Sequence, residues 1–208
     1  MGRFRANEKR SRKVLLTIAI LGAAAAIAGL GTFATFTSTT TATDTFGSGT
    51  VVIALGATGA ATNRLTVAAS GIVPGDTMQR SVDLSNTGTQ DLASISLTTT
   101  ASTSSLLDTD ATNGLQMAIE RCSVDWTESG SSPAFTYTCG GSTSTVLSSR
   151  AVIGSSIALS NLGSLTSGAT DHLRVTLTFP SVAGNTLQGL SSTIAFAFTG
   201  TQRAASAH

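Results

Sequence analysis

Beyond the first fifty residues, apolar and polar residues alternate in short runs. In "HLRVTLTF", the side chains of Leu173, Val175, Leu177 and Phe179 fall on one face and polar side chains on the other. Such alternation predicts a β-strand with one face in a core and the other toward solvent. "STIAFAFTG" repeats the pattern with Ile194, Phe196 and Phe198 inward. "MQRSVDLS" follows it less cleanly, with Met78, Val82 and Leu84 inward.

Turn signals separate these runs. "VPGD" places Pro before Gly, as a type II turn prefers, and "SNTGT" and "VAGN" add further breaks. Many short strands with turns between them predict an all-β fold, a jelly-roll-like antiparallel β-sandwich over residues 50–203 with a tail at 204–208. Helix is scarce there, although "SSLLDTDATNG" has room for one short turn.

A different pattern precedes the sandwich. "VLLTIAILGAAAAIAGL" contains no charge and follows six basic residues and one acidic residue. A cationic stretch before an apolar run is typical of a secretory signal, so we expect residues 1–35 to form an apolar signal helix that is removed. Small residues fit a cut after Ala34, with Thr32 at −3, or after Thr35, which leaves Phe36 first. The alternative is a retained transmembrane anchor, since the uncharged stretch continues to Thr43.

Charge outside the leader is sparse and mildly acidic. The six remaining arginines are scattered singly, so no basic patch suits a nucleic acid. Contact with a membrane is therefore expected only through the leader.

The chain has two cysteines, Cys122 and Cys139, both in the part expected to be exported. Oxidation is permitted there, which favours a disulfide between them and a closed insert at 122–139. The alternative is two unpaired buried thiols. Trp126, Phe135 and Tyr137 of the insert can form a contact patch or, as is more common, pack against the sandwich.

Three blocks of sequence resemble one family. "GTFATF" followed by "TFGSGTVVI" is similar to a cleavage region and a first mature strand. "VPGDTMQRSVDLSNTGTQDLASISL" and "LRVTLTFPSVAGNTLQGLSSTIAFAFTGTQ" are similar to internal strands and a closing hairpin. In this order and spacing they resemble the TasA/camelysin family of secreted surface and biofilm-matrix fibre proteins. The insert "ERCSVDWTESGSSPAFTYTC" departs from that pattern.

The resemblance implies an exported jelly-roll subunit whose leader is removed by a dedicated signal peptidase. It also implies that residues 36–49 act as a donor strand that completes the sheet of a neighbouring copy, or of a related minor subunit. The candidate donor residues are Phe36, Thr37, Thr39, Thr41 and Phe46.

The composition of this segment is compatible with either of two roles. From Phe36 to Phe46 it is rich in β-branched Thr, free of Pro and interrupted only by the charge of Asp44, so it can supply ladder hydrogen bonds to an open sheet edge. A solvated Thr-rich spacer has the same composition.

Some camelysin relatives are described as metalloproteases, but the residues here predict no enzyme. The chain lacks a His-Glu-x-x-His motif and has only two histidines, His172 and His208. We expect His172 to be a solvent-facing strand residue, with Asp171 on the opposite face. "DTDATNG" begins like a calcium loop, but Gly114 falls one place too late, so a surface turn is favoured. No catalytic, cofactor or metal residue is therefore predicted.

The leading interpretation is a secreted, non-enzymatic fibre subunit at the surface or in the matrix of a bacterium. The alternative from another class is a membrane-tethered binding module that retains the leader. A camelysin-type metalloprotease is the third.

Overall fold

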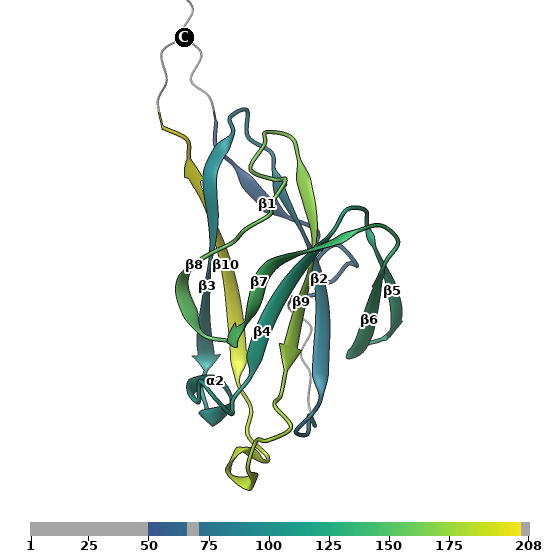
Figure 1. Ribbon diagram of the computed structural model, residues 1–208, viewed down its shortest axis with the longest axis vertical. Helices are drawn as coiled ribbons and strands as arrows, with labels where there is room; N and C mark the ends of the chain where they lie inside the picture. Colours follow the sequence, from purple (N-terminus) through teal and green to yellow (C-terminus); the bar gives the residue numbers. More distant parts are fainter. Residues whose placement is uncertain (1–49, 66–70, 205–208) are drawn as a thin grey trace, which may run out of the picture. The chain divides into compact units, whose positions relative to one another are not determined.

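The computed structural model describes residues 50–65 and 71–204 (Figure 1). Every described residue belongs to the compact unit Ser48–His208. The expected signal peptide and donor segment lie outside the described residues, so both stay predictions.

The described unit is built almost wholly from strands. In chain order the elements are β1 (Ile53–Leu55), β2 (Thr77–Asn86), β3 (Leu92–Thr103), α2 (Leu106–Thr109), β4 (Gln116–Cys122), β5 (Trp126–Ser131), β6 (Ala134–Cys139), β7 (Thr143–Ala151), β8 (Gly154–Ala158), β9 (Thr170–Thr178), η1 (Asn185–Leu187) and β10 (Thr193–Gln202). Within the described residues the prediction of a mostly β fold is confirmed, and α2 lies in the stretch "SSLLDTDATNG" that has room for one short turn.

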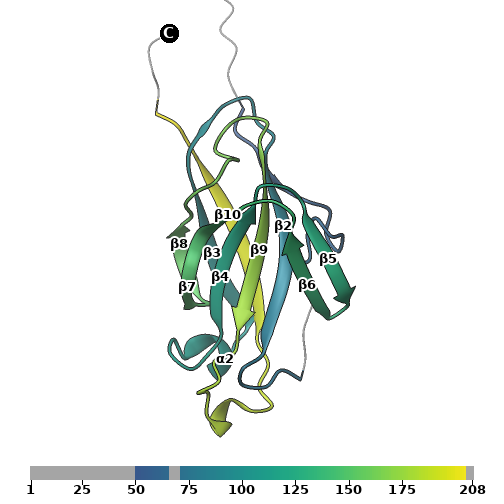
Figure 2. The ribbon, with the colours of Figure 1, turned by 45° about the vertical axis from the view of Figure 1, so that its right-hand side comes forward.

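The strands form two antiparallel sheets and a separate hairpin. The five-stranded sheet has the order β1-β2-β9-β4-β7, the three-stranded sheet has the order β10-β3-β8, and β5 pairs with β6. In Figures 1 and 2 the two larger sheets lie against each other, with the hairpin beside β2 and β9. Strand β9 is central because it pairs with β2 on one side and with β4 on the other.

The core lies between the two larger sheets and follows the alternation in the sequence. Val82 and Leu84 of β2 and Leu173 of β9 are fully buried, and Ile95 and Leu97 of β3 meet them from the other sheet. Asp83 lies between Val82 and Leu84, and His172 directly precedes Leu173. Because side chains alternate along a strand, both project from the outer face of the five-stranded sheet. The periodicity predicted these two faces correctly.

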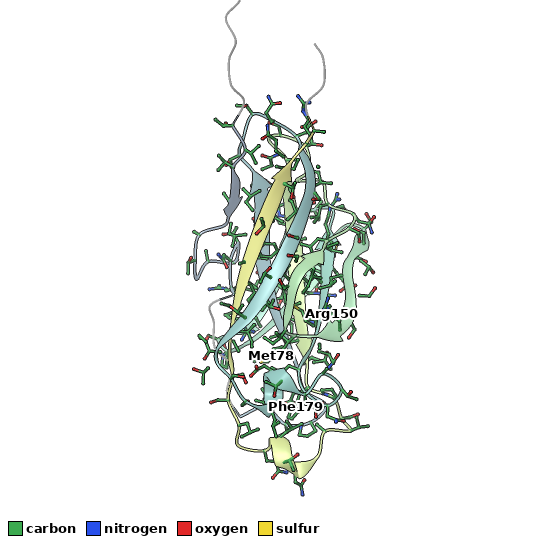
Figure 3. The ribbon with its side chains drawn as sticks, turned by 90° about the vertical axis from the view of Figure 1, so that its left-hand side faces the viewer. Met78, Arg150 and Phe179 are labelled. Atoms are coloured by element: carbon green, nitrogen blue, oxygen red, sulfur yellow. A yellow bond between two sulfur atoms is a disulfide. The ribbon has the colours of Figure 1, made fainter. Side chains whose placement is uncertain are left out.

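One flank of the sandwich is covered less completely. Among the described residues β10 pairs with β3 alone, and Figure 3 shows it in yellow at the side of the three-stranded sheet. Ile194, Phe196 and Phe198 pack against the core but are only partly buried. The expected inward direction of these three side chains is confirmed, although this edge does not bury them fully.

The two ends of the described chain lie at the same end of the sandwich. The Thr50 amide donates to the Thr89 side chain at 3.0 Å, and the Arg203 guanidinium donates to the side chain of Gln90 at 3.0 Å. Both partners belong to the turn between β2 and β3. Strand β10 therefore finishes beside the point where the described chain begins.

Candidate functional site

The most concentrated group of titratable side chains lies on the outer face of the five-stranded sheet. Asp83 of β2 and His172 of β9 are directly opposite each other in the strand register. The Nδ1 atom of His172 is 2.9 Å from an Asp83 carboxylate oxygen, and each side chain is 23% exposed. The β2–β9 pairing therefore holds this contact on a rigid part of the fold.

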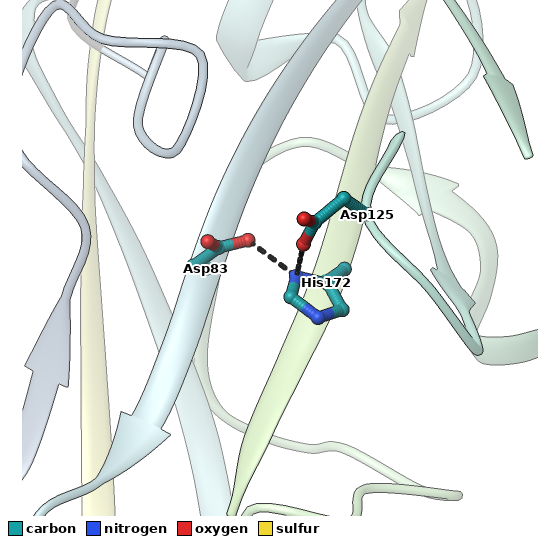
Figure 4. A group of neighbouring side chains, drawn as sticks. All are labelled: Asp83, Asp125 and His172. Carbon is teal, nitrogen blue, oxygen red and sulfur yellow. Dashed lines mark hydrogen bonds and ion pairs between the residues drawn. The ribbon is translucent and has the colours of Figure 1, made fainter. Parts of the chain in front are cut away.

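A third side chain reaches the same nitrogen from the connection between β4 and β5. An Asp125 carboxylate oxygen is also 2.9 Å from His172 Nδ1, although the Asp125 side chain is 86% exposed. Figure 4 shows both carboxylates converging on this one atom, while the other ring nitrogen points away from them.

The backbone around Asp125 is fixed from both sides. The structure contains the disulfide expected from the sequence, joining Cys122 to Cys139, and Cys122 ends the strand from which this connection leaves. On the other side, the Trp126 indole nitrogen donates to the His172 carbonyl at 2.9 Å. The Arg174 guanidinium also lies 4.4 Å from the centre of the Trp126 ring. The connection between β4 and β5 is therefore held close to His172, although the Asp125 side chain itself is exposed.

Glu128 fastens the rest of the hairpin to the segment that follows β1, where the Arg64 amide in turn donates to the Ser81 carbonyl of β2 at 2.8 Å. Its carboxylate accepts hydrogen bonds from Arg64 at 2.9 and 2.6 Å and from the Tyr137 hydroxyl at 2.9 Å. The hydrogen bond from Arg64 lowers the pKa of Glu128, although partial burial opposes this change. Burial raises the pKa of Tyr137, and the bond to Glu128 adds to this rise.

The aromatic residues of the insert pack against the sandwich. Phe135 is 8% and Tyr137 is 5% exposed, and the Arg64 guanidinium lies 4.6 Å from the centre of the Phe135 ring. The Tyr137 amide donates to the Gln79 side chain of β2 at 3.0 Å. The interpretation of these rings as packing residues is therefore correct for Phe135 and Tyr137.

The two acidic features that the sequence raised have local structural roles. Asp171 is fully buried on the opposite face from His172, where it accepts from the Gly163 and Ser164 amides at 2.9 and 2.8 Å. Asp108 is 5% exposed and closes a capping box with Ser105 at the start of α2. A surface turn would leave this carboxylate in solvent, and that expectation is wrong for Asp108, which is buried and accepts from Ser104, Ser105 and Ser192. The structure does have a turn at this place.

Sequence reasoning placed His172 on the outer face but did not find its two carboxylates. Asp83 is 89 residues away in the chain. The alternation of apolar and polar residues along each strand indicated that both side chains lie on outward faces. Their contact depends on which strands are neighbours and in what register they pair. His172 is also less solvent-facing than expected, since the insert covers this part of the sheet.

Several predicted site residues lie outside the described residues. These are the cleavage region (Thr32, Ala34, Thr35 and Phe36) and the candidate donor residues (Phe36, Thr37, Thr39, Thr41 and Phe46). No helix within the described ranges is long and apolar enough to cross a bilayer.

A family model described as camelysin metallo-endopeptidase matches residues 10–207. No curated protein matches the chain.

That description implies a metal ion, and the described residues offer one group with suitable donors. One atom each from Asp83, Asp125 and His172 lies within 4.8 Å of the others. An imidazole with two carboxylates is a donor set that zinc accepts. The group therefore fits an ion by its chemistry, and the site would keep at least one position open to solvent beside the exposed Asp125.

Proposed function

Since the chain belongs to the camelysin family, a TasA-related family of surface or extracellular proteins, we propose that it is a fibre-forming subunit that assembles by donor-strand exchange. In this proposal the segment that begins at Phe36 leaves its own subunit and pairs with the sheet of the next. The partner is a second copy of this chain.

The open edge at β10 is the observation that supports the proposal most directly. This strand has ten residues, and among the described residues only β3 pairs with it. A strand at the edge of a sheet presents unpaired N–H and C=O groups that an extended segment from another chain can pair with. Ile194, Phe196 and Phe198 lie partly uncovered along it, so a bound strand would also bury apolar surface.

The proposed donor has a suitable composition and a suitable starting point. Residues 36–46 are comparable in length to β10 and contain no Pro that would remove a ladder hydrogen bond. They precede Thr50, which is held at the end of the sandwich where β10 finishes. A neighbour stacked at that end would bring its own β10 within reach of the segment.

The test compares two forms of the protein. N-terminal sequencing of secreted material first establishes where the mature chain begins. Protein beginning at Phe36 is expected to form filaments visible by electron microscopy, whereas protein beginning at Ser48 is expected to remain monomeric in size-exclusion chromatography. Equal polymerisation of the shorter form would refute donor-strand exchange.

A peptide of residues 36–46 provides the matched control. It should bind the shorter protein and protect β10 amides from hydrogen exchange. The same peptide with Thr39→Pro and Thr41→Pro should not bind, because proline cannot donate to the ladder. Equal binding of both peptides would exclude main-chain pairing as the source of affinity.

A further inference from the structure

We propose that Asp83, Asp125 and His172 form a binding site for a divalent cation, with Zn²⁺ the best fit, and that the ion fastens the disulfide-closed insert to the five-stranded sheet. The inference is independent of fibre assembly. It rests on the geometry of these three side chains and on how the fold holds them.

The Nδ1 atom of His172 has too few protons for its two carboxylate neighbours. Two carboxylate oxygens lie 2.9 Å from the same ring nitrogen, His172 Nδ1. A ring nitrogen carries at most one proton, so it makes one well-directed hydrogen bond, or two weaker shared ones. A dication between the three atoms would balance both carboxylates, while the ring nitrogen would bind it through its lone pair.

The distances are close to those that an ion requires. Zinc bonds to nitrogen and oxygen of about 2.0–2.2 Å in tetrahedral geometry place ligand atoms roughly 3.3–3.5 Å apart. The two N–O separations of 2.9 Å therefore need to open by a few tenths of an ångström, which the exposed Asp125 side chain permits. At His172 the ion would take the place of the Nδ1 proton, which moves to Nε2 if the ring is neutral and is released to solvent if the ring is doubly protonated.

Neighbouring cationic groups have partners of their own. Arg174, which follows His172 on the same outward face of β9, is paired with Glu120 and stacked on Trp126. Arg121 is paired with the buried Asp171. These two arginines therefore do not offset the negative charge of Asp83 and Asp125. A protonated His172 ring, or an ion bound by all three side chains, would do so.

The fold restricts the backbone positions of all three ligand residues. Asp83 and His172 are opposite each other on paired strands. Asp125 stands between the disulfide-bonded Cys122 and the anchored Trp126. An ion held by both the sheet and the insert would therefore stabilise their contact, whether water or another ligand occupies the open position.

The experiment uses the mature chain with its disulfide intact, without a histidine tag and with His208→Ala, so that His172 is the only imidazole. After treatment with EDTA and dialysis, Zn²⁺ is titrated by calorimetry and the melting temperature is recorded. One ion per chain is expected. At a free concentration near one hundred times Kd, the melting temperature should rise by about 5–11 °C for a domain of this size.

Two variants locate the site. His172→Gln and Asp125→Asn should each weaken Zn²⁺ binding by at least about tenfold, and Asp125 is exposed enough that the second variant should fold normally. Asp91→Asn, in the turn between β2 and β3, is the matched control and should bind as the parent does. A cobalt substitution should give visible absorption bands that disappear in His172→Gln.

The proposal is overturned by either of two results. One is the absence of Zn²⁺ binding at about 1 mM ion, where even a site worth only about 4 kcal/mol would be half occupied. The other is binding that both variants leave unchanged, which would place the ion elsewhere.

Discussion

Removing the disulfide is expected to destabilise the protein by a predictable amount. The bond joins Cys122 to Cys139 across 17 residues of chain. In the chain-entropy model a closed loop of this size reduces the entropy of the unfolded chain by an amount worth about 3 kcal/mol at 25 °C. Because a change of 1 kcal/mol shifts the melting temperature of such a domain by about 2–4 °C, the expected fall is roughly 6–12 °C.

The folded state should tolerate this change. The Trp126 indole, the Glu128 carboxylate and the Tyr137 amide each anchor the insert independently of the sulfur atoms. We therefore expect a Cys122→Ala/Cys139→Ala variant to keep its strand content. The loss should appear in the free energy of unfolding and not in the circular dichroism spectrum of the native protein.

Urea unfolding of the double variant, with each single variant as control, measures this difference. The parent under reducing conditions should match the double variant, which separates loss of the bond from loss of side-chain packing at the buried Cys122. A change below about 1 kcal/mol would refute the entropic argument. Loss of the native spectrum would instead refute the claim that the other contacts hold the insert.

Two further predictions concern the acid response and the core. Burial acts to raise the pKa of Asp108, but hydrogen bonds from Ser192, Ser105 and Ser104 together outweigh it, so the pKa is lowered. The contribution of this carboxylate to stability is therefore present above its unfolded pKa near 4 and is lost as the pH falls through the lower folded value. Asp108→Asn should destabilise the protein at neutral pH and do so less in acid. Urea unfolding at each pH measures this difference. Leu97→Ala removes a fully buried side chain between the two sheets and should cost about 2–5 kcal/mol of unfolding free energy in the same assay.

The insert and the open edge occupy separate parts of the sandwich. The hairpin of β5 and β6 lies against β2 and β9 of the five-stranded sheet, whereas β10 is at the edge of the three-stranded sheet. Pairing of a strand with β10 therefore does not require the insert to move. Assembly and cation binding can be tested independently for this reason.

The sequence by itself determined the faces of the strands. Val82 and Leu84, and likewise Leu173 and Val175, were predicted to point inward and are buried. The compartment and the cysteine count also indicated the one disulfide that the chain can form. These properties are local, because side chains in a strand alternate whatever the strand pairs with.

Only the tertiary structure decided which strands are neighbours and which lie at an edge. The sequence carries no direct signal that Asp83 faces His172, or that the insert folds back to place Asp125 on the same nitrogen. It also did not show that β10, with its three apolar inward residues, is an edge strand. Such contacts join residues far apart in the chain, and their register is set by the packing of the whole core and not by any one segment.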